Sequence, residues 1–186
     1  MDISYYLEQL KSNLGVYNRN EFLTACKLIE LCHSRKGWVF LGGNGGSQSI
    51  VEHFATDWNK GIFEVTGVPL KSFVMNGSSS TLTAFSNDQH YQYTLSNILM
   101  SHGTKNDLLL LVSSSGTSKN IINAYNRAKE IGIETITLSG FGNKSMIRDA
   151  TVSINIDCDD YQIVEDVHSV FGHLILKHFA SMKHKN

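Results

Sequence analysis

The sequence changes abruptly from apolar to polar within the stretch LLLLVSSSGTS, residues 108–118. Its first five residues form an unbroken apolar run, which is typical of a β-strand covered by other elements on both faces. Residues 113–118 then carry five hydroxyl groups and one glycine, and a helical pattern follows over residues 119–131 and ends at Gly132. The stretch therefore predicts a buried strand, a polar loop and a helix in direct succession.

The same alternation of short apolar runs and helical patterns extends along the chain in both directions. It favours βαβ connections and hence a mainly parallel sheet. The sequence predicts an α/β protein, specifically a three-layer α/β/α sandwich with a five-stranded, mainly parallel sheet. The expected strands cover residues 38–41, 70–75, 108–112, 134–138 and 151–156, and the expected helices cover about 2–13, 20–34, 47–59, 79–86, 90–101, 119–131 and 161–181.

Length and the scarcity of chain-breaking segments favour one domain. A chain of 186 residues can build one sizeable core but not comfortably two. It contains a single proline, Pro69, and no low-complexity stretch that would indicate a linker. We expect one domain over residues 1–186, with two N-terminal helices in residues 1–35 and an α/β core in residues 36–186.

Composition argues against several classes of protein. The formal net charge is −1 and no run of Lys or Arg stands out, which disfavours a nucleic-acid binder. No apolar run approaches the roughly 18–20 residues that cross a bilayer, and residues 1–6 lack the pattern of a signal peptide. Three widely scattered cysteines favour a reducing compartment. We expect a cytoplasmic protein.

Two loops have the chemistry of a phosphate site. The first, GGNGGS at residues 42–47, follows an expected strand, and its glycines let backbone N–H groups approach an anion at a helix N-terminus. It matches neither the Walker pattern nor the dinucleotide fingerprint, and a tight turn would also explain it. The second loop, residues 113–118, offers neutral hydroxyl donors, with Ser118 placed as a helix N-cap. Because ligands bind beyond the carboxyl ends of such strands, the two loops together favour an anionic ligand.

Two helices carry a second polar constellation. His53 and Asp57 are four residues apart and share one helix face. On the last expected helix, a turn of about 100° per residue places His173 roughly 80° from Glu165, while His168 points well away from His173. Imidazoles and carboxylates on facing helices could hold a divalent metal such as zinc or form an acid/base set. Spacing alone also allows ordinary surface or buried polar pairs.

These motifs, taken in order, resemble the sugar-isomerase (SIS) domain, and specifically the phosphoheptose isomerase family. The similarity runs through nearly the whole chain. The resemblance implies an aldose–ketose isomerase that converts sedoheptulose 7-phosphate to D-glycero-D-manno-heptose 7-phosphate for surface-polysaccharide precursors. It also implies a homotetramer whose N-terminal helices lie in the subunit interface. The matching segments are residues 43–47, 53–55, 86–88 and 113–118 and the helix that carries His168 and His173.

The resemblance also assigns roles to individual residues. The phosphate of a seven-carbon sugar would bind the hydroxyl-rich loop, and Asp88 would contact sugar hydroxyls. The metal, zinc by analogy, would bind His53, Asp57, Glu165 and His173, and the catalytic residues would be Asp57, Glu165 and His173. The implied substrate-binding residues are Asn44, Ser47, Asp88, Ser113, Ser114, Ser115 and Ser118.

Two positions depart from the family pattern. Asp57 stands where the family has a catalytic glutamate, and Glu165 stands where it has glutamine. Both side chains remain competent metal ligands, but the shorter carboxylate at position 57 is retracted by about one methylene. A displacement of that order can cost roughly 100-fold in rate. Either the helix geometry compensates, or the substrate differs, or the activity is lost.

The proposed chemistry is proton transfer through an enediol(ate). Asp57 or Glu165 would act as general base, and His173 would manage the second proton. Two other functions stay open on the sequence. One, which the resemblance also implies, is a non-catalytic SIS-domain adaptor that binds a protein partner such as a replication initiator. The other is an isomerase or lyase that acts on a different phosphosugar.

Overall fold

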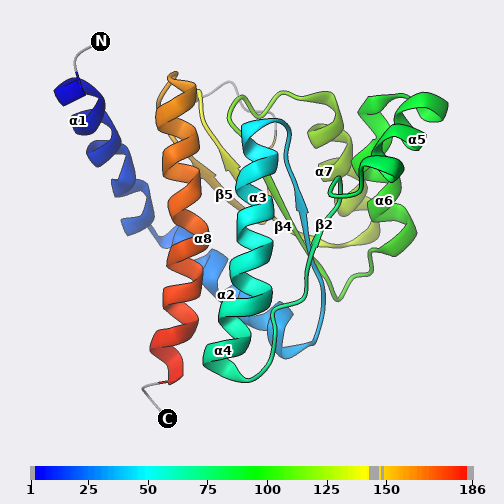
Figure 1. Ribbon diagram of the computed structural model, residues 1–186, viewed down its shortest axis with the longest axis horizontal. Helices are drawn as coiled ribbons and strands as arrows, with labels where there is room; N and C mark the ends of the chain where they lie inside the picture. Colours follow the sequence, from blue (N-terminus) through cyan, green and yellow to red (C-terminus); the bar gives the residue numbers. More distant parts are fainter. Residues whose placement is uncertain (1–2, 143–146, 148, 184–186) are drawn as a thin grey trace.

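Within the described residues the sheet has five strands, and every neighbouring pair is parallel (Figure 1). The computed structural model describes residues 3–142, 147 and 149–183, so residue 2 of the first expected helix lies outside the described residues. The strand order is β2-β1-β3-β4-β5, which confirms the predicted fold class. The strands are β1 (Val39–Gly42), β2 (Ser72–Val74), β3 (Leu108–Ser113), β4 (Glu134–Ser139) and β5 (Val152–Asn155).

Helices cover both faces of the sheet, and this explains the apolar run in β3. Alternate residues of a strand point to opposite faces. Leu108, Leu110 and Val112 belong to one core cluster, and Leu109 and Leu111 belong to the other. The first cluster lies under α2 (Asn20–Ser34), α3 (Gly46–Thr56) and α8 (Tyr161–Lys183), and the second lies under α6 (Thr94–His102) and α7 (Lys119–Ile131).

The helix expected at 47–59 extends further than the sequence pattern indicated. After α3 the chain continues as a π-helical segment, Asp57–Ile62, and then as α4 (Phe63–Thr66). Within the π-helical segment Trp58 is fully buried, and its indole N–H donates to the carbonyl of Gly172 on α8. This tertiary contact anchors the wider turn. Such π-helical turns occur frequently at functional sites, and this one begins at Asp57.

The segment expected to form one helix over 90–101 forms a short 3-10 helix followed by an α-helix. His90 has a φ of 70°, which no helical residue adopts, and it separates α5 (Ser79–Gln89) from a short 3-10 helix, Tyr91–Tyr93. Helix α6 begins only afterwards, at Thr94. The segment that follows α5 therefore turns back toward the sheet, where Tyr91 reaches the glycine-rich loop after β1.

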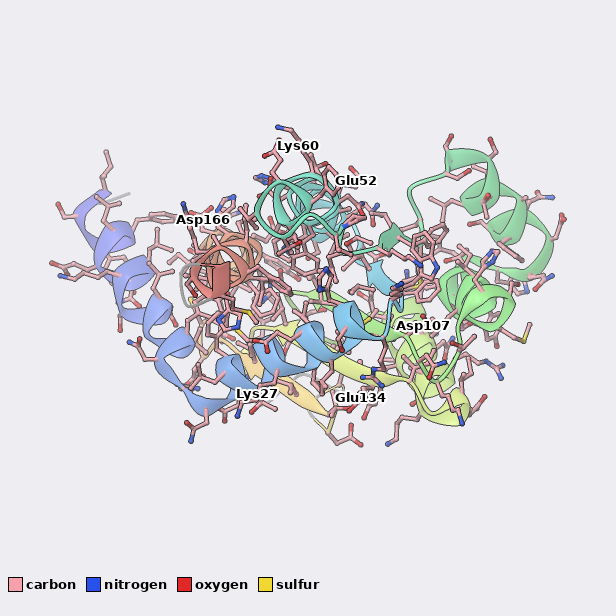
Figure 2. The ribbon with its side chains drawn as sticks, turned by 90° about the horizontal axis from the view of Figure 1, so that it is seen from below. Lys27, Glu52, Lys60, Asp107, Glu134 and Asp166 are labelled. Atoms are coloured by element: carbon pink, nitrogen blue, oxygen red, sulfur yellow. The ribbon has the colours of Figure 1, made fainter. Side chains whose placement is uncertain are left out.

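The N-terminal helix α1 (Ile3–Asn13) lies on the outside of the molecule beside α8 (Figure 2). The phenol of Tyr6 donates to Asp166 Oδ2 at 2.6 Å, and this hydrogen bond fixes α1 to α8. No residue of α1 is buried. Its large apolar side chains Ile3, Tyr5 and Leu7 are 57–73% exposed. Among the described helices, none has the length and apolar character needed to span a membrane.

Candidate active site

The two predicted phosphate loops lie next to each other. The glycine loop (residues 42–47) follows β1, and the serine loop (residues 113–118) follows β3, its direct neighbour in the sheet. The strand order reverses between β1 and β3, and open α/β sheets bind ligands beyond the strand ends at such a point. The sheet topology therefore places both loops at the location where a ligand is expected.

Close packing and backbone geometry require the glycines of the first loop. Gly45 has a φ of 54°, a conformation that L side chains rarely adopt. A Cβ atom on Gly43 would lie 2.6 Å from the backbone of Ser47. Ser47 itself is buried in the first turn of α3. The loop is thus a tight connection that turns the chain directly into the N-terminus of α3.

Some hydroxyls of the serine loop accept hydrogen bonds within the loop, and others make none among the described residues. Ser113 Oγ accepts from the N–H of Gly116 at 3.1 Å, and Ser115 Oγ accepts from the N–H of Thr117 at 3.3 Å. Ser118 occupies the N-cap position of α7, but its side chain makes no capping hydrogen bond. Ser114 Oγ is buried and has no partner among the described residues. The Ser114 hydroxyl is thus buried without a partner, and the Ser118 hydroxyl is not used as a helix cap.

An amide network that was not predicted from the sequence joins the two loops. Asn44 of the glycine loop exchanges two hydrogen bonds with Asn120, at 2.9 and 2.8 Å, and Asn44 Oδ1 also accepts from the phenol of Tyr91 at 2.6 Å. A sequence signal existed, because Asn120 is a polar residue at helical spacing from the apolar Ala124 and Ala128. Asn44, Asn120 and Tyr91 border a cavity of about 690 Å³. The cavity is also lined by His90, Gln92, Ser118 and Lys119.

His53, Asp57 and His173 form a compact group on the outer face of α3 and α8. Asp57 Oδ2 lies 3.5 Å from the Nε2 atoms of both histidines. One ligand atom from each residue lies within 4.8 Å of the others. The imidazole side chains are 55% and 54% exposed and the Asp57 side chain 24%. The group is therefore open on one side.

The donor atoms of this group suit a metal ion. Metal–ligand bonds of about 2.0 Å in a tetrahedral site separate two donor atoms by roughly 3.3 Å, close to the observed 3.5 Å. Two imidazoles and one carboxylate also match the set of three protein ligands that leaves one position open in catalytic zinc sites. The residues present therefore fit a divalent cation.

Glu165 lies apart from this group. A Cβ atom on Gly46 would come within 2.4 Å of its carboxylate, so Glu165 packs against the N-terminus of α3 beside the glycine loop. It precedes His173 by eight residues of α8, which corresponds to a helical rise of about 12 Å. The described structure brings together three residues of the four-residue set expected from the resemblance, and it places the fourth near the phosphate loops.

The remaining candidate residues occupy separate environments. Asp88 is exposed in the last turn of α5, and its Oδ1 accepts from Asn87 Nδ2 at 2.8 Å. His168 is fully buried, in agreement with its expected orientation away from His173. Neither ring nitrogen makes a hydrogen bond among the described residues. The backbone of Ser139 lies near enough to the ring to oppose part of the lowering of its pKa. Burial lowers the pKa of His168 to about 4, which keeps the imidazole neutral.

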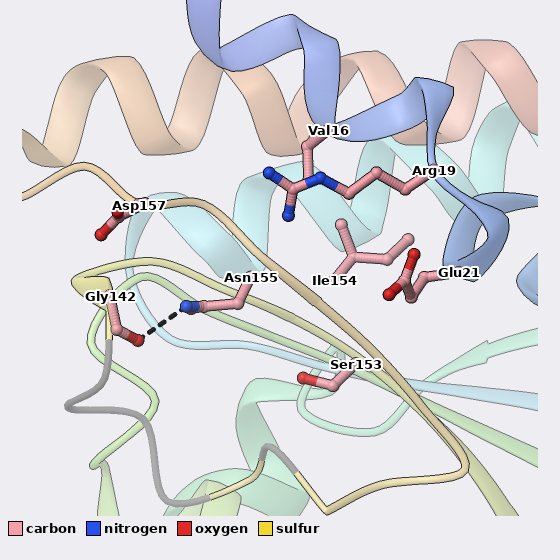
Figure 3. Close-up of a pocket in the computed structure, with 8 residues that line it drawn as sticks. All are labelled: Val16, Arg19, Glu21, Gly142, Ser153, Ile154, Asn155 and Asp157. Carbon is pink, nitrogen blue, oxygen red and sulfur yellow. Dashed lines mark hydrogen bonds between the residues drawn. The ribbon is translucent and has the colours of Figure 1, made fainter.

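A second cavity, of about 370 Å³, lies between the start of α2 and the edge strand β5 (Figure 3). Arg19 and Glu21 project toward it from one side, and Ser153 and Asn155 line the other. Asn155 Nδ2 donates to the carbonyl of Gly142 at 2.6 Å. None of the site residues predicted from the sequence lines this cavity.

Comparison with known proteins decides the family. The family model of the SIS domain matches residues 5–140. The phosphoheptose isomerase of Sulfurimonas denitrificans is 35% identical over 180 residues, which cover 92% of this chain and 91% of that protein. The chain belongs to the phosphoheptose isomerase family of SIS-domain proteins. This result confirms the family and the class of enzyme, an isomerase, that the sequence predicted.

Other phosphoheptose isomerases agree with this assignment. The one from Helicobacter pylori (strain HPAG1) is 33% identical over 155 residues, covering 81% of this chain and 79% of that protein. The structure of phosphoheptose isomerase GmhA from Neisseria gonorrhoeae is similar with a TM-score of 0.83 and 27% identity, and the match covers 96% of each chain. The similarity therefore extends over the two N-terminal helices as well as the α/β core.

Proposed function

We propose that this protein isomerises sedoheptulose 7-phosphate to D-glycero-D-manno-heptose 7-phosphate for surface-polysaccharide precursors. The observation that carries the proposal is the group of His53, Asp57 and His173 at a distance from the two phosphate loops. A phosphosugar isomerase needs two parts. One is a pair of loops that holds the phosphate, and the other is a separate acid/base group. Relatives that are named phosphoheptose isomerase support the same reading.

The separation between the two parts suits a long substrate. His53 stands seven residues after Gly46 on α3, which corresponds to a rise of about 10 Å along the helix. With bonds of about 1.5 Å, an extended seven-carbon sugar phosphate measures roughly 10 Å from C1 to phosphorus. A phosphate held by the serine loop would then leave C1 and C2 near the His53–Asp57–His173 group. A five-carbon substrate would not reach as far.

A divalent cation, zinc by analogy with the family, would be held by His53, Asp57 and His173. When bound, it would supply Lewis-acid polarisation of the substrate oxygens. The open side of the group leaves room for these oxygens. We assign Glu165 to the phosphate end, because it packs against Gly46 and not against the histidines.

The chain's own side chains would carry the protons. In the direction from ketose to aldose, a base removes a proton from C1, and an acid delivers one to C2. Asp57 would accept the C1 proton, and His173 would manage the proton at C2 or at its oxygen. Ser114 and Ser118, whose hydroxyls are not used within the described protein, would hold the phosphate. Ser113 and Ser115 shape the loop through their hydrogen bonds.

We further propose that the chain forms one SIS domain over residues 1–186 and assembles as a homotetramer, and the exposed surfaces support a subunit contact. Helix α1 presents Ile3, Tyr5 and Leu7 to solvent, and such an apolar surface is typical of a subunit contact. The two histidines of the candidate metal group are also more than half exposed. A second subunit placed over them would exclude water from the reaction. We place this assembly in the cytoplasm.

The proposal is tested by incubating the purified protein with zinc and sedoheptulose 7-phosphate and following the sugar by NMR. We expect the aldose product and about one bound metal ion per subunit. Ribulose 5-phosphate serves as the short-substrate comparison and should react far more slowly. Preference for the shorter sugar would identify a different phosphosugar isomerase. Absence of both turnover and bound metal would favour the adaptor function.

A further inference from the structure

The amide pair Asn44–Asn120 connects the two halves of the phosphate site. Asn44 lies in the glycine loop, and Asn120 lies in the first turn of α7, two residues after Ser118. The two side chains exchange hydrogen bonds in both directions. We propose that Asn120 is a positioning residue, which fixes the side chain of Asn44 and thereby holds the glycine loop at a set distance from the serine loop. The inference rests on the proposed function, because it concerns the same sugar-phosphate site.

The hydrogen-bonding capacity of Asn44 is almost fully used. An amide oxygen accepts two hydrogen bonds, and an amide nitrogen donates two. Asn44 Oδ1 accepts from Tyr91 and from Asn120, and one proton of Asn44 Nδ2 goes to Asn120 Oδ1. A single N–H remains for a ligand. Asn44 therefore presents one donor of fixed direction, which suits an acceptor such as a phosphate or sugar oxygen.

Burial makes Asn120 the rigid member of the pair. Asn120 is only 2% exposed, whereas Tyr91, the other partner of Asn44, is 46% exposed. A buried amide without partners costs free energy, so Asn120 has little freedom to leave Asn44. Because Asn120 follows the serine loop directly on a helix, its position is set by the same turn that carries Ser118.

The proposal is tested by a double-mutant cycle with Asn120→Leu and Asn44→Ala. Leucine has nearly the shape of asparagine and makes none of its hydrogen bonds. We expect Asn120→Leu to raise the KM for sedoheptulose 7-phosphate roughly tenfold, with a smaller change in kcat, because a misplaced donor weakens phosphate binding. In the Asn44→Ala background the same substitution should change KM less than twofold. Asn120→Ala provides a second variant if the leucine is not accommodated.

Asn123→Ala is the matched control. Asn123 lies one turn further along α7, and its Nδ2 donates to the carbonyl of Gln92 at 2.9 Å, so it attaches the same helix to the same neighbouring segment without touching Asn44. We expect its KM to equal that of the wild type. Equal losses for Asn120→Leu in both backgrounds, or an equal loss for Asn123→Ala, would overturn the positioning role.

A measurement without substrate separates this inference from the proposed function. In the ligand-free protein, the side-chain amide proton that Asn44 donates to Asn120 should exchange slowly with water and give a resolved NMR signal. Asn120→Leu should accelerate this exchange at least about tenfold at an unchanged melting temperature. Unchanged exchange would overturn the inference whatever sugar the enzyme uses. A wild-type protein that protects Asn44 but does not isomerise the heptose would instead count against the proposed function alone.

Discussion

The Oδ2 atom of Asp57 lies 3.5 Å from the Nε2 atom of His173, although the two residues come from different helices. Asp57 is the first residue of the π-helical segment, and the same oxygen is equally distant from His53. The shorter carboxylate therefore reaches both imidazoles in this fold. The position of Asp57 at the start of the wider helical turn offers a physical reason why aspartate can replace the longer glutamate of the family here.

Removing the charge of Asp57 or the basicity of His173 should lower turnover strongly. General acid–base groups contribute about 100-fold to 10,000-fold to rates, so Asp57→Asn and His173→Gln should each lower kcat at least about 100-fold. Turnover of sedoheptulose 7-phosphate measures the effect, and circular dichroism checks the fold. Glu64→Gln is the matched control, because Glu64 is an exposed carboxylate on α4 that pairs with Lys60. Near-normal activity of either variant would remove that residue from the mechanism.

Lengthening the carboxylate should not improve the enzyme. Asp57→Glu advances the carboxylate by about 1.3 Å into space that is bounded by the two imidazoles. We expect kcat/KM to fall roughly tenfold, because displacements of this size misalign reacting groups. Steady-state kinetics at saturating zinc decide the question. A tenfold gain would instead mean that aspartate is a weakened substitute for a longer side chain.

Glu165→Gln distinguishes the two carboxylates that the sequence left as alternative bases. Glu165 packs against Gly46, away from the histidine group, so the neutral amide should retain kcat within about threefold, with any effect appearing in KM. The pH–rate profile should also keep its shape. A loss of kcat as large as that of Asp57→Asn would transfer the role of base to Glu165.

His168 should make stability depend on pH. Burial lowers its pKa from an ordinary value of 6.5 to about 4. Between these values the unfolded chain binds a proton that the folded protein does not, so the free energy of unfolding should fall as pH drops from about 6.5 to about 4. The contribution is about 3 kcal/mol. The contribution is fully present above about pH 6.5 and is lost by about pH 4, below which His168 causes no further change.

Urea unfolding of the wild type and of His168→Leu at pH 7 and pH 4.5 measures this contribution. The wild type should lose more stability between the two pH values than the variant, because leucine has no titrating group. Other titrating groups are common to both proteins and cancel in the difference. Equal losses would show that His168 accepts a proton in the folded protein as readily as in the unfolded chain.

Strong local patterns made most of the fold predictable. The apolar run of β3 reflects a strand with helices on both faces, and the helix over 119–131 was located correctly because Ser118 and Gly132 mark its ends. The π-helical segment after α3 was missed, because it depends on the burial of Trp58 against α8. Tertiary contacts of this kind leave no periodic signal in the sequence.

The candidate site was predictable only where neighbouring residues define it. The i,i+4 spacing of His53 and Asp57 is a local pattern, and the structure brings His173 to the same place. Helical angles alone could not separate Glu165 from this group, because they omit the rise along α8. The pairing of Asn44 with Asn120 joins two loops that are distant in sequence and required the folded sheet.

Isomerisation in D2O shows whether this protein transfers a proton between C1 and C2 of the heptose phosphate. The zinc-supplemented wild-type protein is incubated with sedoheptulose 7-phosphate, and the products are analysed by NMR and mass spectrometry. Proton transfer through an enediol(ate) delivers a solvent deuteron to C2, so we expect D-glycero-D-manno-heptose 7-phosphate that carries deuterium at C2. An aldose product without deuterium would contradict the proton-transfer mechanism, and the absence of any aldose product would contradict the proposed function itself.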